Sequence, residues 1–155
     1  MTFRAVLALT ALAMAIACAP VHGAAAGGEA RMGASTQVPA PVPADVPVRI
    51  DASRNGQTIE VPIGQRFSVA LVGVPTAGYL WAPTRVPDFI DRAGEASGNT
   101  TTAQGQPGFA GGSHWEVFVF AASAAGRGEL VLEQRRPWET NEPAIDTFRV
   151  TIVAQ

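Results

Sequence analysis

The sequence predicts an all-β fold, and two observations carry this interpretation. Runs of alternating polar and apolar residues recur with turn residues between them, as at residues 66–72, 113–120 and 147–153. No stretch after residue 45 keeps the apolar spacing of a helix. Seven to eight short antiparallel strands within about 110 residues are typical of an immunoglobulin-like β-sandwich, which we therefore expect over residues 45–155.

Each element has its own local signal. Pro47 suits an edge strand, because proline cannot donate a hydrogen bond to a neighbouring strand. Asn55-Gly56 is a strong turn signal, and residues 113–120 are apolar on both faces, which indicates a central strand. Trp81 falls in a middle strand, so we expect it in the core. The expected strands cover residues 46–50, 58–61, 66–72, 79–81, 88–91, 113–120, 129–133 and 147–153, with a long glycine-rich loop at 93–112 and turns at 126–128 and 139–143.

Composition excludes several functional classes. From Asp45 onward nine Arg face twelve Asp and Glu, a net charge of −3, and an acidic domain does not match the phosphates of nucleic acid. His114 is the only histidine of that region and Cys18 the only cysteine of the chain, so a catalytic triad or a zinc site is not expected. We expect a binding module without enzymatic activity, metal or cofactor, and a solvent-facing or edge position for His114.

The first 17 residues have the organisation of an export signal. Arg4 supplies the basic start, and residues 5–17 form an apolar run that is shorter than the roughly 20 residues needed to span a bilayer. The small residues that precede Cys18 resemble the lipobox of bacterial lipoproteins, in which the cysteine is acylated and becomes the first mature residue. The alternative is an ordinary signal peptide and an incidental Cys18. Residues 18–44 are rich in Ala, Gly and Pro, and we expect a disordered linker there.

Three short segments look rigid. Residues 74–79 read Val-Pro-Thr-Ala-Gly-Tyr, in which Pro75 fixes its own φ and Gly78 can adopt a positive φ. Residues 108–112 read Gly-Phe-Ala-Gly-Gly, and residues 136–138 read Arg-Pro-Trp. Rigid loops have little conformational entropy left to lose, so they suit insertion into a narrow cleft. Taken alone, the first segment also fits an ordinary β-turn between two core strands.

In this order, the three segments resemble the loops with which inhibitors of the chagasin family bind papain-like cysteine proteases. The resemblance covers residues 45–155 and implies three loops at one end of an immunoglobulin-like sandwich, which fill the active-site cleft of the protease reversibly and without being cleaved. Val74 and Ala77 stand where the family usually has Asn and Thr, which bears on affinity more than on the fold. Trp138 is the expected aromatic anchor; the alternative is that it folds back onto its own sandwich. The implied protease-binding residues are Val74, Pro75, Thr76, Ala77, Gly78, Tyr79, Gly108, Phe109, Ala110, Gly111, Gly112, Arg136, Pro137 and Trp138.

The sequence thus leads us to expect an exported, monomeric inhibitor of papain-like cysteine proteases. A lipid on Cys18 would attach it to the membrane of the cell envelope or periplasm. The competing class is a non-inhibitory β-sandwich of the cell envelope, such as an adhesion or assembly module. An inhibition assay against papain distinguishes these two classes.

The lipoprotein hypothesis predicts that Cys18 alone carries the lipid, because the chain has no other cysteine. We expect a fatty-acid probe to label the wild-type chain in growing cells and not the Cys18→Ala variant. Acylation by more than one chain also gives stable attachment, so the wild-type chain should sediment with membranes. Equal labelling of both chains, or no labelling of either, contradicts the hypothesis and leaves inhibition untouched.

Overall fold

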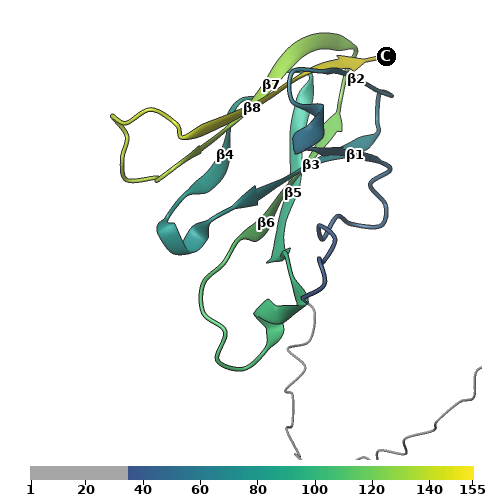
Figure 1. The fold of residues 1–155 in the computed structure, drawn as a ribbon. Coiled ribbons are helices and arrows are strands. Elements are labelled where there is room, and N and C mark those ends of the chain that lie inside the picture. The colour runs from purple at the N-terminus through teal and green to yellow at the C-terminus, as the bar shows by residue number, and fades with distance from the viewer. Residues whose placement is uncertain (1–34) are drawn as a thin grey trace, which may run out of the picture. The chain divides into compact units, whose positions relative to one another are not determined.

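The computed structural model describes residues 35–155, so the expected export signal, Cys18 and most of the expected linker lie outside the described residues. Two four-stranded sheets with strand orders β1-β3-β6-β5 and β2-β8-β7-β4 form the domain (Figure 1). The strands are β1 Val48–Asp51, β2 Thr58–Val61, β3 Arg66–Gly73, β4 Leu80–Arg85, β5 Ile90–Asn99, β6 His114–Ala122, β7 Gly126–Arg135 and β8 Asp146–Ala154, and the short 3-10 turns are η1 Ala52–Arg54, η2 Pro75–Ala77 and η3 Thr102–Gly105. None of these helical turns is long and apolar enough to cross a membrane. The expected all-β sandwich is confirmed.

The two sheets are mixed, which corrects the expectation of purely antiparallel strands. β1 pairs with β3 in parallel, and β2 pairs with β8 in parallel, whereas the other strand pairs are antiparallel. The chain reverses twice between β1 and β3, once around η1 and once at residues 62–65. Two reversals restore the original direction, so β3 runs beside β1 with the same orientation.

The core lies between the two sheets. Phe67 and Phe120 stack with their ring centroids 5.4 Å apart, and Phe148 of β8 joins the same cluster. Trp81 is 7% exposed, and its Nε1 donates a hydrogen bond of 3.0 Å to Val72 O. Trp81 is therefore a core residue, as expected, with a partner for its one polar atom.

Two segments differ from the sequence-based expectations. β5 continues to Asn99, so the first part of the loop expected at 93–112 is a strand that pairs with β6. β5 is an edge strand whose side chains are mostly polar and exposed to water. It therefore lacks the apolar alternation by which the other strands were predicted. The turn expected at 126–128 belongs to β7. Gly126 is needed there because the ring of Phe89 occupies the space of a Cβ.

The last part of the expected linker packs onto the domain. Residues 35–46, which we call the N-terminal strap, lie against the outer face of the first sheet, where Val42 and Val46 contact a cluster that includes Val117 and Val119. The strap therefore covers the second apolar face of β6, and the domain begins before the expected boundary. The expected central position of β6, between β3 and β5, is confirmed.

One half-buried carboxylate, that of Glu116, lies at one end of the sandwich and lines a cleft there. Glu116 Oε2 accepts a hydrogen bond of 2.9 Å from the Trp81 N–H, which joins β6 to β4. A Cβ at Gly73 would overlap Glu116 Oε1, so any other residue there would displace the carboxylate from this position. Burial raises the pKa of Glu116 above its ordinary value of 4.5 and outweighs the Trp81 N–H, which lowers it; repulsion from Glu95 adds to the rise, and His114 opposes it.

The raised pKa of Glu116 predicts a pH-dependent stability. A group with a raised folded-state pKa stabilises the fold fully below its ordinary pKa, 4.5 for Glu116, and this contribution is lost as the pH rises through the folded-state value. Glu116→Gln keeps an oxygen for the Trp81 N–H and removes the charge. We therefore expect its free energy of unfolding to rise relative to wild type as the pH increases from about 4 to about 8, measured by urea unfolding. Glu116→Ala, which also loses the hydrogen bond, is the control, and parallel pH profiles for wild type and Glu116→Gln contradict the prediction.

Candidate functional site

The segments that the sequence singled out leave the sandwich at one end. Gly73, at the end of β3, and Asn99, at the end of β5, both pair with His114 at the start of β6. In the other sheet, Leu80 at the start of β4 pairs with Arg135 at the end of β7. Three connections therefore leave the same end of the two sheets (Figure 1). They are loop 1 (residues 74–79), loop 2 (residues 100–113) and loop 3 (residues 136–145).

Loop 1 is a closed turn built on η2. The Ala77 N–H donates to Val74 O over 3.0 Å, and the Gly78 N–H donates to Pro75 O over 2.8 Å. Gly78 has a φ of 81°, a left-handed conformation that residues with a Cβ adopt only at a cost. The main chain of loop 1 is therefore closed by its own hydrogen bonds, and Gly78 has the positive φ expected from the sequence.

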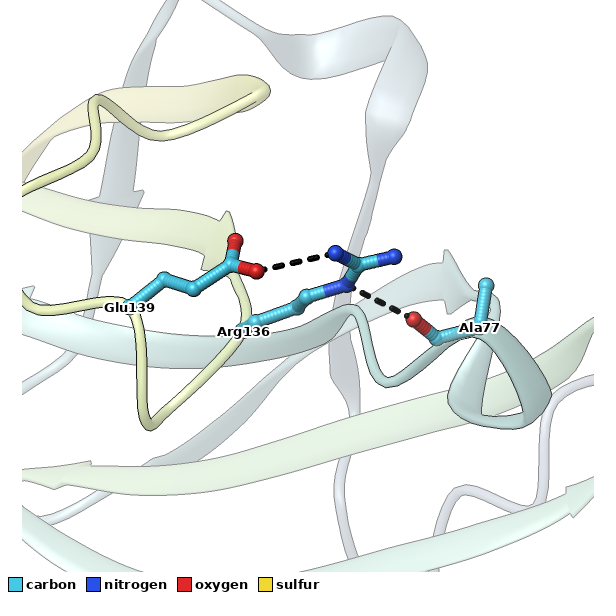
Figure 2. A network of polar contacts seen from close by, with 3 residues as sticks. All are labelled: Ala77, Arg136 and Glu139. Carbon is cyan, nitrogen blue, oxygen red and sulfur yellow. Dashed lines mark hydrogen bonds and ion pairs between the residues drawn. The ribbon is translucent and has the colours of Figure 1, made fainter.

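Arg136 ties loop 3 to loop 1, as Figure 2 shows. Its Nε donates a hydrogen bond of 3.0 Å to Ala77 O, and its Nη1 donates one of 2.9 Å to Glu139 Oε1. The guanidinium carbon also lies 4.6 Å from the centroid of the Tyr79 ring. A planar guanidinium can stack on an aromatic ring and donate hydrogen bonds from its edge at the same time. The compact ammonium group of a lysine lacks this planar geometry. The hydrogen bond to Glu139 raises the pKa of Arg136, which therefore stays charged.

Trp138 is exposed and held in place by loop 1. It is 67% exposed, yet its ring lies against Gly78. A Cβ at Gly78 would stand 2.9 Å from Trp138 Cζ2 and closer still to Cη2. The ring thus rests on loop 1 and does not fold back onto the sheets. An exposed tryptophan with a fixed position has the properties of an interface hot spot.

Loop 2 contains η3 and then the glycine-rich tip. Gly108, Gly111 and Gly112 have φ values of 82°, 86° and 98°. Positive φ at three positions in five residues explains why glycine recurs there. Phe109, between them, is exposed. The tip therefore offers one aromatic side chain on a main chain that few other sequences could adopt.

Gln104 closes the base of loop 2. Its Oε1 accepts hydrogen bonds from the N–H groups of Thr100 and Thr101, over 2.7 and 2.9 Å. Its Nε2 donates a hydrogen bond of 2.7 Å to Ser113 O, so one side chain joins the two ends of the loop. The sequence reasoning missed Gln104, although Thr101 and Gln104 have the spacing of a capping box, a signal that could have found it.

An open cleft of about 560 Å³ lies between loop 1 and the strands that carry loop 2. Pro75 and Leu80 contribute to one side, and Ser97 and His114 contribute to the other. His114 begins the central strand β6 and is half-buried, with no hydrogen-bond partner for Nδ1 among residues 35–155. The expectation of a solvent-facing or edge histidine is corrected.

The contact between Gly78 and Trp138 predicts a coupling between loops 1 and 3. Gly64 has the same φ of 81° as Gly78 but open space around its Cβ position. We expect each glycine-to-alanine change to cost about 1–2 kcal/mol for the left-handed conformation. Gly78→Ala should cost more, because it also displaces the Trp138 ring.

A double-mutant cycle tests this coupling by urea unfolding. In a Trp138→Ala background, the cost of Gly78→Ala should fall to that of Gly64→Ala, whose cost should stay unchanged. An excess cost at Gly78 that persists without the Trp138 ring shows that the two loops are not coupled through this contact.

Comparisons with known proteins agree with this architecture. The family described as chagasin family peptidase inhibitor I42 matches residues 60–152, and no curated protein sequence matches the chain. A cysteine protease inhibitor from Entamoeba histolytica has 16% sequence identity and a TM-score of 0.61, over 70% of this chain and 95% of its own. The solution structure of amebosin has 24% identity and a TM-score of 0.55, over 70% of this chain and 97% of its own. These structures share the fold, and the family match, which covers more than half of the sequence, shows that this chain belongs to the chagasin family of peptidase inhibitors.

Proposed function

We propose that this protein is a reversible, tight-binding inhibitor of papain-family cysteine proteases that inserts loops 1, 2 and 3 into the active-site cleft. The observation that carries this proposal is the distribution of exposed apolar side chains. Among residues 35–155, seven large hydrophobic side chains are exposed. All of them except Ile63 lie in the three loops or in the strand ends beside them, namely Val72, Val74, Leu80, Phe109, Trp138 and Ile145.

A concentration of apolar groups at one end of a small domain marks a surface that is covered by a partner. Three loops together can bury the roughly 800 Å² per partner that a stable interface needs, which one loop cannot. Trp138 of loop 3 offers the largest exposed ring and rests on Gly78 of loop 1, so it is the proposed anchor. The cleft beside Pro75 lies between loop 1 and the strands β5 and β6, which carry loop 2.

Loop 1 is suited to block a protease rather than to be cut by one. The N–H groups of Ala77 and Gly78 are already bonded within the loop. They are therefore not free to pair with the main chain of a protease as an extended substrate would. Thr76, at the centre of η2, would lie against the catalytic cysteine and exclude water and substrate.

The proposal includes export and membrane attachment. The apolar leader and the small residues before Cys18 support it, and the labelling experiment described above tests it. Inhibition by inserted loops needs only one copy of the chain for each protease molecule. A monomer in solution and a one-to-one complex with the protease are therefore expected.

The proposal predicts a strong loss of inhibition when the anchor or the tip is changed. Trp138→Ala should weaken binding by about 2 kcal/mol or more, near thirty-fold in the dissociation constant. Thr76→Asp should also weaken it, because it forces a charge into a desolvated cleft beside the catalytic thiolate. The measurement is a competitive inhibition constant against papain, with the melting temperature as the folding control.

Three variants serve as controls for this experiment. Ile63→Ala truncates another exposed apolar side chain, at the opposite end of the domain, and should inhibit like wild type. His114→Ala should change inhibition little, and Val74→Asn should leave it unchanged or improve it. If inhibition survives both Trp138→Ala and Thr76→Asp, the proposed binding site is wrong and the inhibitory function stands. A wild-type chain that inhibits no papain-like enzyme overturns the proposed function and favours the envelope module.

A further inference from the structure

The N-terminal strap does more than cover the outer face of the sheet, because its first residues are bonded to the base of loop 2. The Thr102 N–H, in η3, donates to Thr36 O over 2.9 Å. The Thr36 N–H donates back to Thr102 Oγ1 over 3.1 Å. Two hydrogen bonds in opposite directions thus join the beginning of the strap to η3, which leads into the glycine-rich tip.

Two further hydrogen bonds hold Val38, the next bonded residue of the strap. The Val38 N–H donates to Thr100 O over 2.8 Å, and Val38 O accepts from Trp115 Nε1 over 2.7 Å. Thr100 begins loop 2, and Trp115 is the second residue of β6, two positions after the loop ends. Val38 therefore bridges both ends of loop 2 from the outside, while Gln104 bridges them from the inside.

We propose that the N-terminal strap is a positioning segment for loop 2, and that it thereby sets how tightly the inhibitor holds its protease. This inference rests on the proposed function. The family match begins at residue 60, so the strap lies outside the matched part of the chain. The family match therefore includes loop 2 but not the segment that supports it.

Loop 2 needs such support more than the other two loops do. Loop 1 is closed by its own main chain, and Arg136 fixes loop 3 against it. Loop 2 instead has three glycines with positive φ in its tip, and glycine keeps the most freedom in an unsupported chain. Freedom that remains in the free inhibitor must be lost on binding, so holding the base of the loop in advance increases affinity.

The first test uses the free protein and needs no protease. Val38→Pro in the full chain removes the N–H that donates to Thr100 O. The matched control is Ala44→Pro, at the second position of the turn closed by the Val46 N–H, where proline is favoured and no described hydrogen bond is lost. We expect amide hydrogen exchange of residues 100–104 to rise about fivefold or more in Val38→Pro only. Unchanged exchange in that segment, with a folded protein, overturns the positioning role.

The second test measures inhibition of papain by the full chain. Val38→Pro removes the hydrogen bond to Thr100 O, and Trp115→Phe removes the one to Val38 O. Each variant thus loses one of the two bonds by which Val38 holds the ends of loop 2, and each should raise the inhibition constant about fivefold. Thr102→Val, which loses the acceptor for the Thr36 N–H, should behave like them, whereas Thr102→Ser keeps the oxygen and should restore wild-type inhibition.

A double-mutant cycle separates positioning of loop 2 from a general loss of stability. In a Phe109→Ala background, in which loop 2 has lost its exposed ring, the effect of Val38→Pro should shrink to less than about twofold. In a Trp138→Ala background, the full effect should remain. Equal effects in both backgrounds, or no effect of Val38→Pro and Trp115→Phe on inhibition, overturn the proposal.

The two tests also separate this proposal from the proposed function. If the wild-type chain inhibits no papain-like protease, the inhibitor function fails and the claim about affinity fails with it. Hydrogen exchange still decides whether the strap positions loop 2. If the wild-type chain inhibits and the strap variants inhibit equally well, the function stands and the role of the strap is wrong.

Discussion

The domain depends on a single constraint, the two apolar faces of β6. Phe118 and Phe120 point into the core between the sheets, while Val117 and Val119 belong to the outer cluster. A strand of this kind must be covered on both sides, because each exposed face would leave large apolar side chains in water. The second sheet covers one face, and the N-terminal strap covers the other. The strands that flank β6 then place the ends of loops 1 and 2 beside each other.

The three loops reach a fixed conformation by different physical means. Loop 1 is held by its own main-chain hydrogen bonds. Loop 3 is held against loop 1 by the hydrogen bond from Arg136 to Ala77 O and by the contact of the Trp138 ring with Gly78. Loop 2 relies on side-chain and strap contacts at its base, since a glycine-rich tip cannot hold itself. If the three loops form the proposed binding surface, this preorganisation means that little entropy is lost when they enter a cleft.

A half-buried carboxylate lies near the start of loop 1. Glu116 joins β6 to β4 through the Trp81 N–H, directly below the start of loop 1, and its burial disfavours the charged form. Gly73 leaves room for this carboxylate, because a side chain there would displace it. The same glycine ends β3, so the space for Glu116 and the start of loop 1 are set by one residue.

The sequence by itself determined the class of fold, the burial of Trp81, the central position of β6, the positive φ of Gly78 and the family. These follow from local periodicity, from proline and glycine, and from the order of three short motifs. Only the tertiary structure decided the parallel edge pairings, the extension of β5 and the packing of the strap. It also decided the contacts of Arg136 with Ala77 and of Gln104 with Ser113. Most of these features join residues that are distant in the chain. The extension of β5 escaped the sequence analysis because its residues are polar. The alternation of residues along a strand determines which of its faces is apolar. Which segment covers that face depends on how distant parts of the chain pack against it.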